Sequence, residues 1–145
     1  MRLSTKGEYG LLAIIDVALH AMDGPVQSWQ IAERQGIPKQ YLDQLMLGLR
    51  KAGLIESSRG RQGGYILARP ASRISILDIV TAMEGPLENI NFQGKGGHAL
   101  SPAREALNSL WNDLFQTVGE TLRRKTLDDL CDEHKRIENQ IMYYI

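Results

Sequence analysis

The stretch from residue 27 to residue 67 places the strongest constraint on the fold, because its pattern predicts two short helices joined by a tight turn. Ser28 can cap a first helix that runs through Gln35, and Gly36 can adopt the left-handed conformation that ends it. Pro38 suits the first position of a second helix, where no amide partner is lost. The apolar residues of this helix recur at helical spacing on one face: Leu42, Leu45, Met46 and Leu49. The pattern is typical of a helix-turn-helix.

The opposite face of the second helix is polar, and in a helix-turn-helix this face is presented to the major groove of DNA. Gln40 and Gln44 lie one turn apart and are the expected base readers, since a glutamine carboxamide can pair bidentately with adenine. Lys39, Tyr41 and Arg50 are better suited to hold phosphates. The alternative interpretation is an ordinary helical hairpin with a solvated polar face.

Two strand-like runs, 54–57 and 65–67, follow the second helix and are joined by a basic loop rich in glycine. Arg59 and Arg61 are expected at the tip of this hairpin, with Gly60 between them. Glycine permits positive φ and close backbone approach, and arginine is attracted to the negative potential of a narrow minor groove. The hairpin is therefore predicted to be a DNA-binding wing. The alternative is a solvated surface loop.

The charges are divided unevenly along the chain, although 17 basic and 17 acidic residues make it neutral overall. Residues 1–73 contain ten Lys or Arg and six Asp or Glu, a net charge of +4, whereas residues 74–145 contain seven and eleven, a net charge of −4. Basic groups gather where phosphates must be neutralised, so the N-terminal half is expected to bind nucleic acid and its affinity to fall steeply with salt.

Further helices are predicted on both sides of the helix-turn-helix. Residues 5–8 have a capping-box pattern that opens a supporting helix through about Met22. Its inner stripe is expected to comprise Leu11, Ile15, Ala18, Leu19 and Met22. Ser75 begins a short amphipathic helix that ends at Gly85, and residues 88–100 are predicted to form a loop.

The longest helix is expected to begin at Ser101 and Pro102 and to continue to about Arg124. Its wide apolar stripe includes Leu107, Leu110, Trp111, Leu114, Phe115, Val118 and Leu122. After a winged module, such a helix favours a dimer interface, for which we select Leu107, Leu110, Trp111, Leu114 and Val118. A homodimer would place two recognition helices in successive major grooves, ~34 Å apart, on a pseudo-palindromic operator in double-stranded DNA. The alternative is a helix packed within its own chain.

Thr126 is expected to cap one more short helix, followed by an apolar, β-prone tail at 140–145. The predicted fold class is mainly α: a winged helix-turn-helix with a two-stranded β wing and a long C-terminal dimerisation helix. We divide the chain into a DNA-binding domain at 1–86, a glycine-containing loop at 87–100, and a dimerisation helix with its tail at 101–145.

Several segments together resemble the IscR and CymR family of bacterial transcription regulators. They are residues 3–10, 41–45, 49–55 and 59–65, and the resemblance extends over nearly the whole chain. It implies a homodimeric winged-helix repressor or activator that governs iron-sulfur assembly, cysteine metabolism or redox stress. It also places Gln40, Tyr41 and Gln44 in the recognition helix and Arg59 in the wing. Lys39 and Gln40 depart from the IscR-like residues, which leaves the DNA sequence that is read open.

The resemblance also bears on a cofactor, because members that carry an iron-sulfur cluster have three cysteines around the loop at 92–98. Here Phe92 and His98 stand at two of those positions, and no cysteine occurs near Arg104. An iron-sulfur cluster usually has four ligands, most of them thiolates, so no cofactor is expected. The alternative is a cluster with atypical ligands, for which Glu84, His98 and Cys131 are the candidates, or groups shared across a dimer.

Other function classes have less support. Scattered histidines and the single cysteine suggest no catalytic constellation, so the chain is not expected to be an enzyme. A protein-interaction adaptor that uses the winged fold without DNA is an alternative. The sequence has no apolar run of ~20 residues and no signal-peptide pattern, which predicts a cytoplasmic protein with no membrane partner. The end of the chain resembles the cysteine-metabolism branch, which suggests cysteine synthase as a partner that accepts Ile145.

Overall fold

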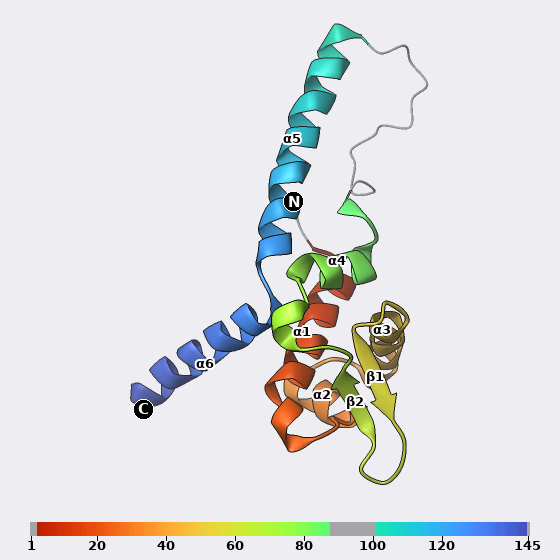
Figure 1. The fold of residues 1–145 in the computed structure, drawn as a ribbon, viewed down its shortest axis with the longest axis vertical. Helices are drawn as coiled ribbons and strands as arrows, with labels where there is room; N and C mark the ends of the chain where they lie inside the picture. Colours follow the sequence, from red (N-terminus) through yellow and green to blue (C-terminus); the bar gives the residue numbers. More distant parts are fainter. Residues whose placement is uncertain (1–2, 88–100, 145) are drawn as a thin grey trace.

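The structure, a computed structural model, describes residues 3–87 and 101–144. The elements in chain order are α1 (Thr5–Leu19), α2 (Ser28–Gln35), α3 (Lys39–Lys51), β1 (Ile55–Ser58), β2 (Gly64–Leu67), α4 (Ile76–Glu84), α5 (Pro102–Arg124) and α6 (Leu127–Tyr143), with short 3₁₀ turns at Ala21–Asp23 and Ala71–Arg73. Figure 1 shows α1 to α4 and the small sheet in one body, from which α5 and α6 project in different directions. The predicted mainly helical, winged helix-turn-helix fold is confirmed.

The core lies where α1 meets α2, α3 and α4. The predicted stripe of α3 is confirmed, because Leu42, Leu45, Met46 and Leu49 are all buried. Gly36 ends α2 in the left-handed conformation, with φ +64°, as the sequence predicts. The helix starts differ slightly, since Gln27 caps α2 in place of Ser28, and Pro38 is the cap of α3 and not its first residue. Differences of this size are ordinary at helix ends.

The details of α1 differ from the prediction. Ser4, not Thr5, is the cap, and its hydroxyl oxygen accepts a hydrogen bond from the Gly7 amide. The helix ends at Leu19, and the 3₁₀ turn that follows leaves Met22 98 % exposed, so including Met22 in the inner stripe was wrong. The most deeply buried apolar side chains of α1 are Ala13, Ile14 and Val17. A backbone that turns out of the helix no longer carries its residues along the helical face.

The wing is an antiparallel pair in which Ile55 lies opposite Leu67 and Ser58 lies opposite Gly64. Both strands differ by one residue from the runs predicted at 54–57 and 65–67. Val26 adds a bridge on the outer side of β2, because its amide donates to the Tyr65 carbonyl at 2.9 Å and its carbonyl accepts from the Tyr65 amide at 2.7 Å. The segment before α2 is therefore attached to the wing by backbone hydrogen bonds.

The C-terminal part departs most from the prediction, because α6 is one continuous helix through Tyr143, not a short helix followed by a β-prone tail. The Thr126 cap is confirmed, since its hydroxyl accepts from the Asp129 amide at 3.2 Å. Ile137 and Ile141 lie one turn apart, and this helical spacing outweighs a weak, context-dependent β preference.

Leu127, at the start of α6, is fully buried and belongs to the core. Its amide donates to the Ile74 carbonyl at 2.8 Å, and the Ile76 amide donates to the Lys125 carbonyl at 2.8 Å. These bonds attach the α5–α6 junction to the start of α4. None of the helices in the described part of the chain combines the length and the apolar character needed to cross a bilayer.

Candidate nucleic-acid interface

The outer face of α3 carries the polar residues that the sequence selects as base readers and phosphate contacts. Gln40 and Gln44 are exposed, and neither carboxamide makes a hydrogen bond to another described residue. Lys39 Nζ lies 3.2 Å from Asp43 Oδ2, an exposed ion pair one turn apart. Exposed pairs of this kind contribute about 0–1 kcal/mol, so the lysine can exchange the carboxylate for a phosphate at little cost.

Tyr41 and Arg50 connect α3 to its neighbours. Tyr41 is half-buried, and its ring meets the ring of Tyr9 in α1 edge to face, with centroids 5.9 Å apart. Such a pair stabilises the angle at which α3 lies against α1. Arg50 Nη1 donates to Ser57 Oγ at 3.3 Å and so joins the end of α3 to β1. The exposed polar face of α3 is thus held next to the wing.

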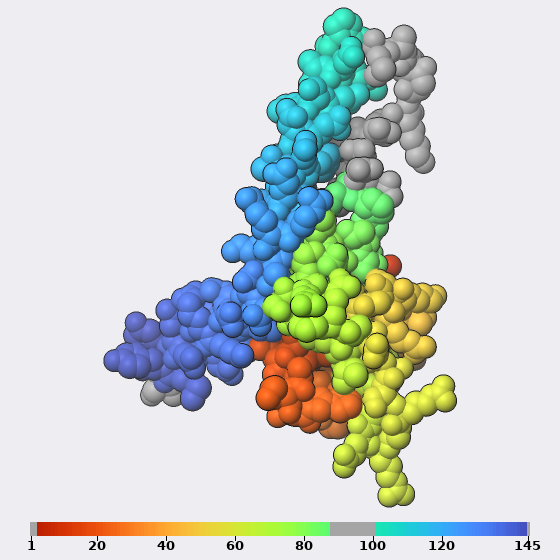
Figure 2. Space-filling view, in the orientation of Figure 1, coloured from red at the N-terminus to blue at the C-terminus, as the bar shows by residue number. Residues whose placement is uncertain are grey.

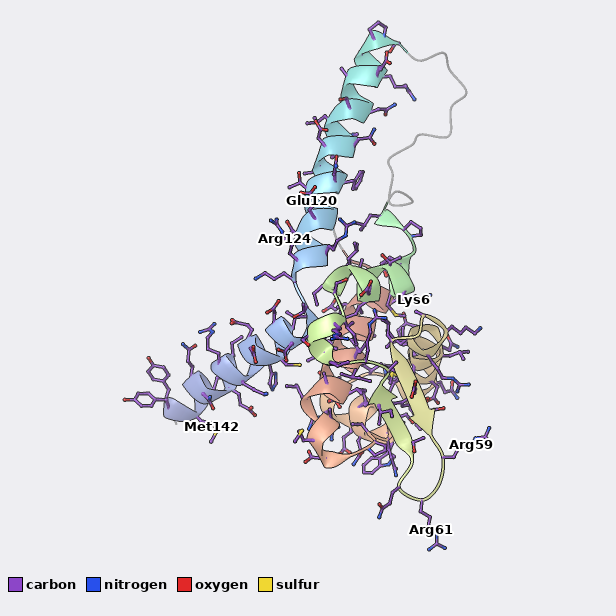
Figure 3. The ribbon with its side chains drawn as sticks, in the orientation of Figure 1. Lys6, Arg59, Arg61, Glu120, Arg124 and Met142 are labelled. Atoms are coloured by element: carbon purple, nitrogen blue, oxygen red, sulfur yellow. The ribbon has the colours of Figure 1, made fainter. Side chains whose placement is uncertain are left out.

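Arg59 and Arg61 lie at the tip of the wing, and Figure 3 shows both side chains directed away from the body. Their guanidinium groups make no hydrogen bond or ion pair with the residues that the structure describes. Gly60 has φ +109°, a conformation that favours glycine, and its carbonyl accepts from the Gly63 amide at 3.0 Å. The turn therefore presents two unpaired cations on a narrow hairpin.

Gly64 brings the wing close to the segment before α2. A Cβ atom at this position would lie 2.5 Å from the Val26 carbonyl oxygen, closer than atoms can approach. The absence of a side chain is what permits the Val26–Tyr65 bridge. The place of the wing beside α2 thus depends on this glycine.

A buried carboxylate links α1 to α2, the first helix of the helix-turn-helix. Asp16 is 1 % exposed, and it accepts hydrogen bonds from Arg34 Nε at 3.0 Å, Arg34 Nη2 at 2.7 Å and Gln35 Nε2 at 2.9 Å. Burial alone would raise the pKa of Asp16, but these hydrogen bonds and the charge of Arg34 outweigh it and lower the pKa. The Asp16 carboxylate in turn raises the pKa of Arg34. The sequence analysis missed this pair, for which the one signal was an acid inside the apolar run of α1.

The stripe of α5 selected for dimerisation lies on a helix that projects from the body (Figure 2). Leu107, Leu110 and Leu114 are 49 %, 62 % and 40 % exposed, and Trp111 and Val118 are half-buried. The Trp111 and Phe115 rings lie 6.3 Å apart. Apolar side chains in water at this density are typical of a surface that another protein chain covers.

Of the candidate iron ligands, Glu84 and Cys131 lie in the described part of the chain, and neither belongs to a metal-binding group there. Glu84 accepts hydrogen bonds from the Ser4 amide, at 3.1 Å, and from the Ser4 hydroxyl, so its carboxylate stabilises the start of α1. Burial raises the pKa of the Cys131 thiol, which disfavours the thiolate that iron requires. His98 lies outside the described residues. Within 3–87 and 101–144, no three His, Cys, Asp or Glu side chains are grouped so that they could hold a metal ion.

One cysteine in the whole chain does not fit an ordinary cysteine-ligated cluster, which needs several thiolates. The features that remain are a helix-turn-helix with an exposed polar face on α3, a basic wing, and a long helix, α5, with an exposed apolar stripe. Together they define a winged helix-turn-helix transcription regulator.

Comparison with known proteins identifies the family. The model of the Rrf2 family, described as iron-dependent transcriptional regulators, matches residues 3–133, and the chain belongs to this family. IscR of Yersinia enterocolitica, an HTH-type transcriptional regulator, is 41 % identical over 138 residues, which cover 95 % of this chain and 84 % of IscR. The resemblance to IscR and CymR is confirmed.

Two solved structures are similar over most of the chain. CymR, the global cysteine regulator of B. subtilis, has a TM-score of 0.77 and 34 % identity, covering 92 % of this chain and 98 % of CymR. T. potens IscR has a TM-score of 0.75 and 39 % identity, and the match covers 92 % of this chain and 88 % of T. potens IscR. The relatives are transcription regulators, so this protein is a DNA-binding transcription regulator and not an enzyme.

Proposed function

We propose that the protein binds a pseudo-palindromic operator as a homodimer, with α3 in the major groove and the wing in the adjacent minor groove. The observation that carries this proposal is the contact of α3 with β1, because it joins the helix that carries the two unpaired glutamines to the hairpin that carries the two unpaired arginines. Gln40 and Gln44 read bases, and Lys39, Tyr41 and Arg50 hold phosphates. Arg59 and Arg61 enter the minor groove, where Gly60 allows close approach.

The homodimer forms through the apolar stripe of α5 defined above. In this proposal residues 1–86 form the DNA-binding domain, 87–100 the connecting loop, and 101–145 the dimerisation helix and tail. Two domains related by twofold symmetry read half-sites one helical turn apart. The regulated genes belong to iron-sulfur, cysteine and sulfur, or redox-stress metabolism, the processes implied by the family resemblance. The protein acts in the cytoplasm, where the bacterial chromosome lies.

Selection of binding sites from a random duplex library tests this function. We expect the recovered sequences to be pseudo-palindromic and binding to weaken steeply with salt. Replacing Arg59 and Arg61 together by alanine should make the slope of log K against log salt shallower by up to about 3.6, since the homodimer loses four arginines and each contact contributes about 0.9. Arg136→Ala is the matched control, because this arginine lies on α6 and is paired with Glu133. Recovery of no sequence would favour the adaptor alternative.

An atypical iron-sulfur sensor is a second candidate, favoured by the description of the family as iron-dependent regulators. Glu84, His98 and Cys131 would be the ligands. Protein purified without oxygen should be colourless and free of iron and sulfide, because one cysteine does not supply the thiolates that an ordinary cluster needs. A coloured, iron-containing protein whose colour is lost in His98→Ala would establish the sensor instead.

The end of α6 supports a partner role. Tyr143 and Tyr144 are each 87 % exposed, and Figure 1 shows the end of α6 far from the body. Since this segment resembles the tail of the cysteine-metabolism branch, we propose that Ile145, which lies outside the described residues, enters the active site of cysteine synthase. Titration calorimetry with cysteine synthase tests this. Binding that is lost on deletion of Ile145 supports it, and no heat with the unaltered protein contradicts it.

A further inference from the structure

The tip of the wing, residues 59–63, is held to the rest of the protein by one side chain. Gln27, the cap of α2, donates a hydrogen bond from Nε2 to the Arg61 carbonyl oxygen at 3.5 Å, across 34 residues of sequence. The Gly63–Gly60 bond at the tip stays within the turn. Among the described residues, no other hydrogen bond connects the tip to an element outside the wing.

The orientation of the Gln27 carboxamide is set by Trp29. The indole Nε1 of Trp29 donates to Gln27 Oε1. With its oxygen engaged by an N–H donor, the carboxamide must direct its NH₂ group toward the Arg61 carbonyl. The Gln27 backbone amide also donates to Gln30 Oε1 at 3.0 Å. Both the backbone and the side chain of Gln27 are therefore hydrogen-bonded to residues in the first turn of α2.

Trp29 is 51 % exposed, which core packing alone does not explain. Its contact with Gln27 is the hydrogen bond from the indole N–H to the carboxamide oxygen. The Val26–Tyr65 bridge holds β2 close to the tip, because Tyr65 pairs with Ser57 one position before the last pair of the hairpin. Gln27, the next residue after Val26, contacts the tip itself through the Arg61 carbonyl.

We propose that Gln27 and Trp29 are positioning residues for the wing, and that they set where Arg59 and Arg61 meet the DNA minor groove. The inference rests on the proposed function of the wing. A hairpin tip that is already ordered loses less conformational entropy on binding. The Gln27–Arg61 hydrogen bond therefore increases DNA affinity although neither Gln27 nor Trp29 touches the DNA. It also sets the distance between the contacts of the wing and those of α3, and hence which minor-groove segment is read.

The test measures binding by fluorescence anisotropy, on a duplex of about 30 base pairs that carries the selected sequence. We expect Gln27→Ala to weaken binding by about 4- to 100-fold, because one net hydrogen bond provides about 2- to 10-fold and the homodimer loses one from each wing. Gln27→Glu should weaken it at least as much, because a carboxylate accepts from Trp29 but cannot donate to the Arg61 carbonyl. Trp29→Phe removes the N–H donor and shortens the aromatic side chain but keeps the Gln27 carboxamide, so it should give a smaller loss. Gln140→Ala, an exposed glutamine on α6, is the matched control and should bind normally.

The decisive comparison is the same Gln27→Ala change in a protein that already lacks both wing arginines. If Gln27 acts through them, the change has no further effect there, whereas a general loss of folding would weaken binding equally in both backgrounds. Equal losses, or normal binding by Gln27→Ala and Trp29→Phe, would overturn the inference alone. If replacing the arginines themselves leaves binding unchanged, the role of the wing and this inference both fail.

Discussion

Replacing Arg34 by alanine should destabilise the protein more than replacing its partner Asp16 by asparagine, because the two members of the Asp16–Arg34 pair are buried unequally. Asp16 is 1 % exposed, whereas the Arg34 side chain is 35 % exposed. Without Arg34, the carboxylate stays in an apolar setting and loses its only cationic hydrogen-bond donor among the described residues. Without the carboxylate, Arg34 can turn toward water.

The magnitudes follow from this asymmetry. Leaving a buried charge unpaired costs about 3–5 kcal/mol. We expect about 3 kcal/mol for Arg34→Ala, because Gln35 still donates to the carboxylate and His20 Nδ1 lies 3.6 Å from Asp16 Oδ1. Asp16→Asn keeps the shape of the side chain but weakens its hydrogen bonds, for a loss of about 2 kcal/mol. In the Asp16→Asn background residue 16 is neutral, so removing Arg34 leaves no unpaired buried charge. Arg34→Ala should then cost only about 1 kcal/mol.

Urea unfolding at one fixed protein concentration measures these free energies, since a dimer would make stability depend on concentration. The sign of the pH effect provides a second check. The folded-state pKa of Asp16 is lowered, so the pair stabilises the protein above the ordinary Asp value of 3.8, and this contribution is lost as pH falls through the folded-state pKa. The difference between wild type and Arg34→Ala should therefore shrink in acid. An equal cost of Arg34→Ala in both backgrounds, or a difference that does not vary with pH, would refute the reasoning.

Three further predictions concern other parts of the chain. Gly64→Ala should cost about 1–3 kcal/mol in urea unfolding, because its Cβ would lie 2.5 Å from the Val26 carbonyl oxygen; unchanged stability would mean that the wing moves freely. Leu110→Asp with Leu114→Asp should give a monomer by analytical ultracentrifugation, since charges would enter the proposed α5 interface; a persistent dimer would place the interface elsewhere. Because burial raises the pKa of Cys131, iodoacetamide at neutral pH should modify it far more slowly in folded than in urea-unfolded protein; equal rates would contradict its burial.

Local pattern was enough to predict helix α3 and which of its faces is buried. The apolar spacing of Leu42, Leu45, Met46 and Leu49 assigns one face of α3 to the core and the opposite face to solvent, and the structure buries all four. Gly36 marked the turn correctly because few other residues adopt positive φ without strain. The hairpin that carries Arg59 and Arg61 was also predicted, with strand ends that differ by one residue.

The C-terminal helix shows where pattern was insufficient. Residues 140–144 contain β-branched and aromatic side chains, which favour strands only when a neighbouring strand is available. In this fold the described part of α6 has no strand beside it, so the helix that begins at Thr126 continues to Tyr143. Met22 was wrongly predicted for a different reason. It is apolar and stands at the expected helical spacing, but α1 ends at Leu19, so Met22 is exposed.

The sequence by itself determined the helix-turn-helix, the basic hairpin and the apolar long helix, because each depends on periodicities and turn residues within a short stretch of chain. Only the tertiary structure decided which side chains meet across the fold. Asp16 and Arg34 are 18 residues apart in sequence, and Gln27 and Arg61 are 34 apart. Neither pair shares a helical face or a strand register, so no local spacing marks them as partners. Their contacts arise because the packing of α1 on α2, and of the wing beside α2, brings distant segments within hydrogen-bond distance.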